Sequence, residues 1–305
     1  MHKKEEFYDK VVRGIREKLG EDFAVDVREV LKVNITLDGL TILYKEDNIS
    51  PTIYLNRYRD DFDAGRPLED IIEDILEVYE SNRNPEHISV QQFFDFDKLK
   101  DKIIIKVISS EKNKRLLEKI PHVLIGDLEL AAIPYVMLEN RADGSMGFQI
   151  QNSHLEMWGK SLSDIMPLAA ANTNKMYRFV VKSMTEMLFN IVGSDMFWDE
   201  EDVEMSSYDE PLYVLTTLEN KILGASQLYL KDKIREFSTK CDSNLYILPS
   251  SIHELILIRE DFVEYSVQEL KEMVQDVNES TVTEEEFLSD NVYYYDKEMD
   301  EIRRL

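Results

Sequence analysis

The sequence predicts an α/β protein of the α+β type, with mixed, largely antiparallel sheets and packed amphipathic helices. Three observations favour this class. Apolar residues recur at helical spacing in several segments, and short runs rich in β-branched and aromatic residues lie between these segments. Part of this order of segments also occurs twice along the chain, which raises the hypothesis of an internal duplication.

The beginning of the chain predicts a helix, a meander of antiparallel strands and a second helix. Gly20 suits a left-handed cap at the end of the first helix. The apolar face of this helix consists of Phe7, Val11, Val12, Ile15 and Leu19. Residues 23–37, 40–45 and 52–56 read as strands, and the pair Asp38-Gly39 is the expected turn between the first two. A second apolar stripe follows Pro67 and predicts a strong helix, with Leu68, Ile71, Ile72, Ile75, Leu76 and Tyr79 on one face.

The repeated order links residues 52–71 with residues 147–165. Both segments read as a strand, a polar corner, a short helix, a glycine, a basic residue and the start of a longer helix. The equivalent pairs are Gly65 and Gly159, Leu68 and Leu162, Asp70 and Asp164, and Ile71 and Ile165. Serines followed by an acidic residue three positions later predict helix caps at Ser153, Ser161, Ser183 and Ser266.

An acidic stretch marks the expected division of the chain. Residues 199–210 are rich in Asp and Glu and have little apolar periodicity, which is typical of an exposed linker. We therefore expect an N-terminal α/β unit at residues 1–198 and a C-terminal α/β unit at residues 211–305. The second unit should contain a strand, a helix, a hairpin and a further helix.

Composition excludes several classes of function. The chain has 36 basic and 61 acidic side chains and a formal charge of -25, which would repel both a nucleic-acid backbone and an anionic membrane surface. The apolar stretch at residues 122–138 is broken by polar residues before it reaches the ~20 residues of a membrane span. The first ten residues lack the apolar core of a secretory signal, and Cys241 is the single cysteine. We expect a cytoplasmic protein whose partner is another protein or a small molecule.

The segment LYILPSSIHELILI, at residues 245–258, holds the candidate site. Ser250, Ser251, His253 and Glu254 are set into a nearly unbroken apolar run, so they are the candidate catalytic residues. A hydrolase triad from these residues alone has poor geometry. The Cβ atoms of Ser251 and His253 would be ~6.5 Å apart on one face of a strand, and the Glu254 side chain would point to the opposite face. A structural hairpin explains more: Pro249 ends one strand, and the serines bond local backbone groups in the turn.

Metal chemistry has little support in the sequence. The segment beginning at His253 lacks a second histidine one helical turn later, since Leu257 occupies that position, so the zinc-protease pattern fails. Asp209, Glu219 and Lys221 resemble a fragment of a nuclease site, but no basic patch accompanies them. We expect neither a metal nor another cofactor.

Four motifs carry a resemblance to a known family: LPSSIHE at residues 248–254, GxxLEDI at 65–71, IPYVML at 133–138 and LSDNVYYY at 288–295. Over about residues 20–300, the chain resembles the bacterial family called domain of unknown function 5688. The segment at residues 154–173 is also similar to part of domain of unknown function 1444. Thr217 stands where the first family's pattern leads us to expect Asn. The resemblance implies a stand-alone cytosolic bacterial protein and supplies no activity.

These observations leave two functions open. The first is a non-catalytic binding or regulatory module in the cytoplasm. The alternative is a hydrolase that uses Ser250 or Ser251 with His253 and takes its orienting carboxylate from a distant segment.

Overall fold

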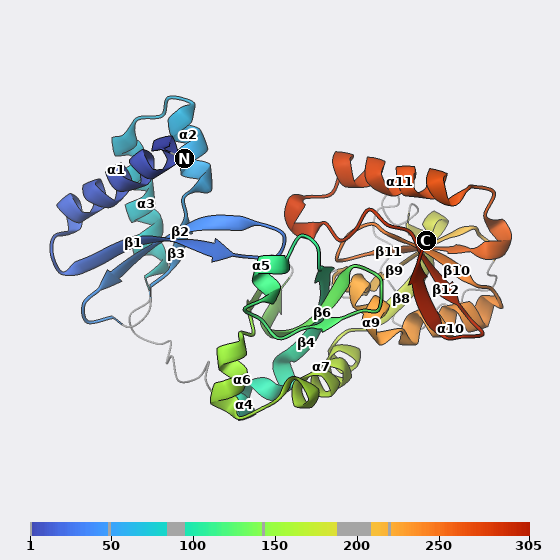
Figure 1. Ribbon diagram of the computed structural model, residues 1–305. Helices are drawn as coiled ribbons and strands as arrows, with labels where there is room; N and C mark the ends of the chain where they lie inside the picture. The colour runs from blue at the N-terminus through green and yellow to red at the C-terminus, as the bar shows by residue number, and fades with distance from the viewer. Residues whose placement is uncertain (1, 48–49, 84–94, 142–143, 188–208, 219–220) are drawn as a thin grey trace. The chain divides into compact units, whose positions relative to one another are not determined.

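The computed structural model describes residues 2–47, 50–83, 95–141, 144–187, 209–218 and 221–305, and these residues form helices and three mostly antiparallel sheets (Figure 1). The expected α+β class is therefore confirmed. The chain divides into two compact units, Met1–Phe96 and Asp97–Leu305.

The first unit contains a three-stranded sheet with its own core. Helix α1 (His2–Leu19) is followed by β1 (Phe23–Leu31), β2 (Thr36–Tyr44), β3 (Thr52–Tyr54), α2 (Asn56–Asp63) and α3 (Leu68–Asn82), and the sheet order is β1-β2-β3. The predicted apolar faces of α1 and α3 supply buried residues to one core with the sheet, among them Val11, Ile15, Ile71 and Ile75. Gly20 has a φ of +84°, as the predicted cap requires.

The predicted turn at Asp38-Gly39 is wrong, because both residues lie inside β2. The chain reverses earlier, where Lys32 N donates to Ile35 O and Asn34 takes the positive φ of 64°. Asp38 is nearly buried and accepts a hydrogen bond of 2.6 Å from the Tyr8 hydroxyl. Gly39 is required by packing, since a Cβ there would lie 2.7 Å from Thr52 Cγ2.

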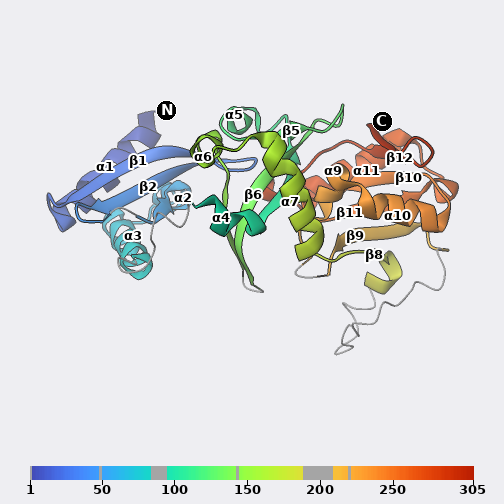
Figure 2. The same ribbon diagram turned by 90° about the horizontal axis from the view of Figure 1, so that it is seen from below.

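The second unit begins with a four-stranded sheet. Its elements are α4 (Phe96–Leu99), the 3₁₀ helix η2 (Lys100–Lys102), β4 (Ile103–Ser109), α5 (Lys114–Leu117), β5 (Val123–Leu124), β6 (Leu130–Arg141), β7 (Gly144–Gln149), α6 (Asn152–Trp158) and α7 (Leu162–Met176). Strand β6 pairs with β4, β5 and β7. Helix α7 runs beside this sheet (Figure 2) and satisfies the edge of β4: Thr173 Oγ1 accepts from Ile105 N, and Asn172 Nδ2 donates to Ile103 O.

The order of elements around the two predicted repeats is the same, β3-α2-α3 and β7-α6-α7. Gly65 and Gly159 follow the short helices with φ values of +98° and +60°, so glycine has a backbone reason in both places. A common origin of the two segments stays a prediction. The predicted caps at Ser161, Ser183 and Ser266 are confirmed. The cap at Ser153 is wrong, because Gln151 caps α6 through His154.

A six-stranded sheet completes the second unit, with the order β13-β12-β10-β11-β9-β8. Its elements are β8 (Phe179–Ser183), β9 (Leu212–Thr217), η3 (Gly224–Ser226), α9 (Gln227–Leu230), α10 (Asp232–Cys241), β10 (Leu245–Pro249), β11 (Leu255–Arg259), η4 (Glu260–Phe262), α11 (Val267–Ser280), η5 (Glu284–Glu286), β12 (Tyr293–Asp296) and β13 (Glu301–Arg304). Helices α10 and α11 lie on opposite faces of the sheet (Figure 1).

The expected acidic linker at residues 199–210 lies almost entirely outside the described residues. Strand β8 precedes it and β9 follows it, and these two strands pair from Phe179↔Thr217 to Ser183↔Tyr213. The division into residues 1–198 and 211–305 stays a prediction, and it differs from the two compact units that meet at Phe96.

Candidate functional site

The predicted hairpin is confirmed, since β10 and β11 pair from Leu245↔Arg259 to Pro249↔Leu255. Residues 250–254 form its turn. The backbone nitrogens of Ser250 and Ser251 donate to Glu254 O at 3.2 and 3.3 Å, and Ser251 Oγ accepts from His253 N at 3.0 Å. The Ser251 hydroxyl therefore closes the turn through the backbone of His253.

Three neighbouring elements hold the backbone of this turn. The carbonyl of His253 accepts hydrogen bonds from Gly224 N at 2.8 Å and from Thr216 Oγ1 at 3.1 Å. Ile252 N donates to Glu286 O, in η5, at 2.9 Å. Gly224 leaves no space for a side chain, because a Cβ there would lie 2.4 Å from His253 O. The turn is thus fixed from β9, η3 and η5.

The His253 imidazole faces a carboxylate from η5. Its Nε2 atom is 3.7 Å from Glu286 Oε1, while its buried Nδ1 atom has no hydrogen-bond partner among the described residues. Burial lowers the His253 pKa; Glu286 opposes this change, and the positive charge of Lys106 reinforces it. Burial therefore favours the neutral form of the imidazole.

Lys106 lies in the middle of β4, within the apolar run of residues 103–108. Its Nζ atom is 3.5 Å from the centre of the Tyr135 ring, and no carboxylate of the described residues forms an ion pair with it. Burial lowers the pKa of Lys106 to about 8. Strand β4 lies against η3, whose Gly224 binds the His253 carbonyl. We call Lys106, Tyr135, His253 and Glu286 the lysine–histidine cluster.

The predicted candidates are therefore only partly brought together. Ser251 Oγ accepts a hydrogen bond from the backbone nitrogen of His253 and does not bind its imidazole. Glu254 is half-buried; burial raises its pKa, while the positive charge of Lys221 lowers it. Glu254 contributes its backbone carbonyl to the turn. The orienting carboxylate that the hydrolase hypothesis takes from a distant segment has a counterpart in Glu286.

Sequence reasoning missed Lys106, Glu286 and Gly224. The available signal for Lys106 was a single charge inside the run IIIKVI, where a strand is otherwise apolar. The backbone is also strained just before Gly224. Lys221 and the buried Leu223 have φ values of +49° and +63°, which are unfavourable for residues other than glycine. Such strain is common at functional sites, but the sequence gives no sign of it.

The predicted nuclease fragment cannot be assembled, because Glu219 lies outside the described residues. Across the described ranges, no three His, Cys, Asp or Glu side chains are placed to hold a metal ion. Thr217, which replaces the expected Asn, has a structural role, because its Oγ1 donates to Ile222 O at 2.8 Å and accepts from Ile222 N at 3.0 Å.

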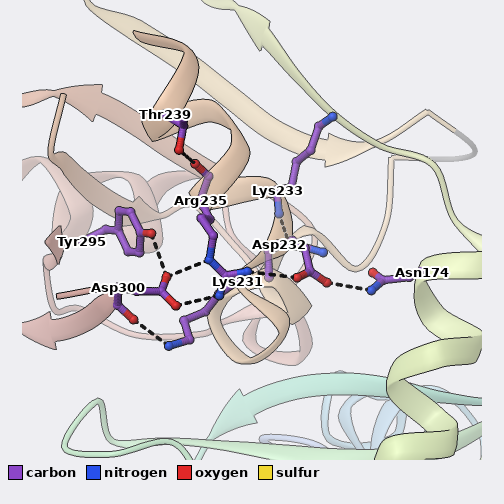
Figure 3. A network of polar contacts seen from close by, with 9 residues as sticks. Asn174, Lys231, Asp232, Lys233, Arg235, Thr239, Tyr295 and Asp300 are labelled. Atoms are coloured by element: carbon purple, nitrogen blue, oxygen red, sulfur yellow. Dashed lines mark hydrogen bonds and ion pairs between the residues drawn. The ribbon is translucent and has the colours of Figure 1, made fainter. Parts of the chain in front are cut away.

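A second polar network joins α10 to the turn between β12 and β13 (Figure 3). The Arg235 guanidinium donates to both oxygens of Asp300, at 3.0 and 2.7 Å, and the Tyr295 hydroxyl donates to Asp300 Oδ1 at 2.8 Å. Lys231 Nζ donates to the Asp300 carbonyl at 2.8 Å. These groups satisfy one another, so the network holds two elements together and is not a candidate site.

A hollow of about 530 Å³ lies along α1 and is lined by Asp9, Val12, Arg13, Arg16 and Glu17. It contains none of the predicted candidates. All of its lining residues come from one helix, and none of the described ones has a buried polar atom without a partner. The lysine–histidine cluster and the turn beside it therefore remain the candidate functional site.

The fold and this site define an α+β protein with a partly buried polar cluster between two sheets of its second unit. The chain belongs to the family of unknown function DUF5688, whose family model matches residues 4–297. The predicted resemblance to that family is confirmed, and the similarity to domain of unknown function 1444 stays a prediction. No curated protein and no solved structure matches the chain. Among the described helices, none has the length and apolar character needed to cross a membrane.

Proposed function

We propose that the protein is a non-catalytic binding or regulatory protein of the cytoplasm, which takes a protein or small-molecule ligand at the lysine–histidine cluster. The orientation of His253 carries this proposal. A hydrolase imidazole has an acid on one nitrogen and the nucleophilic hydroxyl on the other. Here Nε2 faces Glu286, but the buried Nδ1 has no serine hydroxyl, or any other partner, among the described residues.

The serines also favour binding over hydrolysis. Ser251 Oγ accepts the hydrogen of His253 N, so its bond stabilises the turn. Gly224 N, which could have donated to an oxyanion, already donates to His253 O. Two groups of the cluster support a polar ligand. Among the described residues, Lys106 Nζ contacts the Tyr135 ring without a carboxylate partner, and the buried His253 Nδ1 has no hydrogen-bond partner.

A fluorophosphonate probe, which modifies activated serines, separates the two functions. We expect no labelling of Ser250 or Ser251 in the folded protein, because neither hydroxyl has a base. The double variant Ser250→Ala, Ser251→Ala is the matched control, and peptide mass spectrometry is the readout. Stoichiometric labelling of either serine, lost in His253→Ala, would establish the hydrolase alternative instead.

Co-purification from native cells then tests the binding role itself. Mass spectrometry of proteins and small molecules should find one ligand or partner with the parent chain at near-equal amounts. The variant Lys106→Met should recover much less of it, while Lys112→Met, at a lysine outside the cluster, should recover as much as the parent. A parent chain that carries no ligand and no partner would contradict the proposal.

A further inference from the structure

Strand β1 is an open edge of the sheet in the first unit. The sheet order β1-β2-β3 leaves one side of β1 without a strand partner among the described residues. With 9 residues, β1 is the longest edge strand in the described part of the chain. Natural sheets protect such edges with prolines, lysines, bulges or short strands. Strand β1 contains no proline and no lysine, and its register with β2 is continuous from Phe23↔Tyr44 to Leu31↔Thr36.

The hydrogen-bond ladder shows which backbone groups of β1 point outward. Lys45 N donates to Asp22 O, and Lys32 N donates to Ile35 O, at the two ends of the pairing with β2. Antiparallel strands exchange hydrogen bonds at every second residue pair, so the even-numbered residues of β1 bond to β2. The N–H and C=O groups of the odd-numbered residues therefore point away from the sheet. These residues are Phe23, Val25, Val27, Glu29 and Leu31.

Helix α1 crosses the sheet obliquely and reaches this edge near the start of β1. The Tyr8 hydroxyl donates to Asp38 in β2, whereas Arg16 Nη2 donates to Val25 O in β1 at 2.7 Å. A carbonyl oxygen has two lone pairs, so Val25 O can accept a second hydrogen bond. The hollow along α1 adjoins the same edge, because Arg16 also lines it. A further strand beside β1 would therefore lie next to this hollow.

The charges of β1 are complementary to those of a second copy. Asp26 and Arg28 are exposed on the face opposite Val25, and within one chain they bind each other at 2.6 Å. Antiparallel pairing of two copies about Val27 places Asp26 of each opposite Arg28 of the other, in a non-hydrogen-bonded pair where side chains are closest. The neighbouring registers, about Asp26 or about Arg28, place like charges opposite each other, which is destabilising.

The register about Val27 also complements Arg16. It places Glu29 opposite Val25 of the second copy, on the face that packs against α1. Arg16 of the second copy binds the carbonyl of that Val25, so the Glu29 carboxylate faces a guanidinium beside the hollow. The register therefore matches opposite charges on both faces of the paired strands.

We propose that the protein forms a homodimer in which the β1 strands of two copies pair antiparallel about Val27 and join two three-stranded sheets. This surface belongs to the first unit, so the inference does not depend on the lysine–histidine cluster. Pairing of single strands buries less area than the ~1,600 Å² of a standard interface, and the charge of -25 on each copy opposes association. We therefore expect a weak dimer, with a dissociation constant on the order of 10 µM.

Sedimentation velocity of the full chain over a range of concentrations measures this equilibrium. Asp26→Arg makes each copy less negative, which favours association in general, but it sets an arginine opposite Arg28 of the second copy. We expect this variant to raise the dissociation constant by at least roughly 10-fold. Asp127→Arg, at an exposed carboxylate of the second unit, changes the net charge equally and should not weaken the dimer.

Exchange of the two charges separates β1 pairing from any other interface. Arg28→Asp alone should also weaken the dimer, and the double variant Asp26→Arg, Arg28→Asp should restore the parent affinity within about 3-fold. An equimolar mixture of the two single variants should form heterodimers, because each chain then meets opposite charges. A dimer that Asp26→Arg does not weaken would overturn the inference. So would a parent chain that stays monomeric at roughly 300 µM, which would leave the edge to a strand of a different protein.

Discussion

At the scale of single residues, the leucines and the serines of the β10–β11 hairpin contribute differently to stability. Leu257 is fully buried, so Leu257→Ala should lower the free energy of unfolding by roughly 2–5 kcal/mol. Ser251→Ala removes one turn hydrogen bond and should cost about 1 kcal/mol. Equilibrium unfolding in urea measures both changes. A larger loss for Ser251→Ala than for Leu257→Ala would contradict the structural assignment of the turn.

Gly224 should be the most sensitive glycine near the site. An alanine Cβ there would lie 2.4 Å from His253 O and 2.7 Å from Leu215 O, both backbone atoms that cannot rotate away. We expect Gly224→Ala to cost roughly 2 kcal/mol or more and to displace the turn. Gly14→Ala is the control, because its Cβ would meet only the flexible end of Ile72, at 2.4 Å. Similar melting temperatures for the two variants would show that the turn does not need this close approach.

The residues of the site illustrate the limit of sequence reasoning. Ser251 and His253 were predictable as a turn, because proline and serine have local backbone preferences. Lys106 and Glu286 come from β4 and η5, far from each other and from the turn in the sequence. Their relation to His253 arises from tertiary packing, which a local pattern does not encode.

At the scale of secondary-structure elements, Asp300 links α10 to the β12–β13 turn. Hydrogen bonds from Arg235, and then from Tyr295, lower the Asp300 pKa to about 2 against an opposing effect of burial. A lowered carboxyl pKa contributes stability that is present above the unfolded value near 3.8 and is lost as pH falls through about 2. Asp300→Asn should therefore cost about 1 kcal/mol at pH 6, since this side chain is partly exposed.

Thermal unfolding between pH 2 and pH 6 tests this link. The difference between the parent and Asp300→Asn should shrink as pH falls below about 4 and should nearly vanish at pH 2. Asp127→Asn, at an exposed carboxylate in the loop between β5 and β6, controls for general loss of charge. A difference that stays constant over this range would show that the carboxylate charge does not stabilise the turn.

Helices and strands were predictable from the sequence where local residue preferences agree with tertiary packing. The apolar stripes of α1 and α3 and the capping boxes at Ser161 and Ser266 were predictable from residue spacing. The pair Asp38-Gly39 resembled a turn, but β2 continues through it, because Tyr8 binds Asp38 and close packing by Thr52 and Val30 requires a glycine. The pair has a local preference for a turn, but long-range contacts determine its conformation here.

At the scale of the whole molecule, the two compact units should fold separately. The buried core of the first unit lies entirely within residues 1–96, and the pairing of β8 with β9 lies entirely within residues 97–305. We expect both fragments to unfold cooperatively, as measured by circular dichroism in urea. A fragment of residues 211–305 should not, because it lacks β8 and the Leu128 carbonyl that binds the Tyr293 hydroxyl. Cooperative unfolding of that fragment would instead support the expected division at residues 199–210.

The proposed binding role predicts that Lys106 lowers the stability of the fold, and the free energy of unfolding of Lys106→Met tests this prediction most directly. A lysine whose pKa falls from 10.5 to about 8 on folding opposes folding fully below about pH 8, and this effect disappears above 10.5. Lys106→Met should therefore be more stable than the parent at pH 7 by roughly 1–3 kcal/mol, and this gain should vanish near pH 11. Lys112→Met should stay within about 0.5 kcal/mol of the parent. A less stable Lys106→Met protein at pH 7 would contradict this prediction, because the amine would then be part of what holds the fold together.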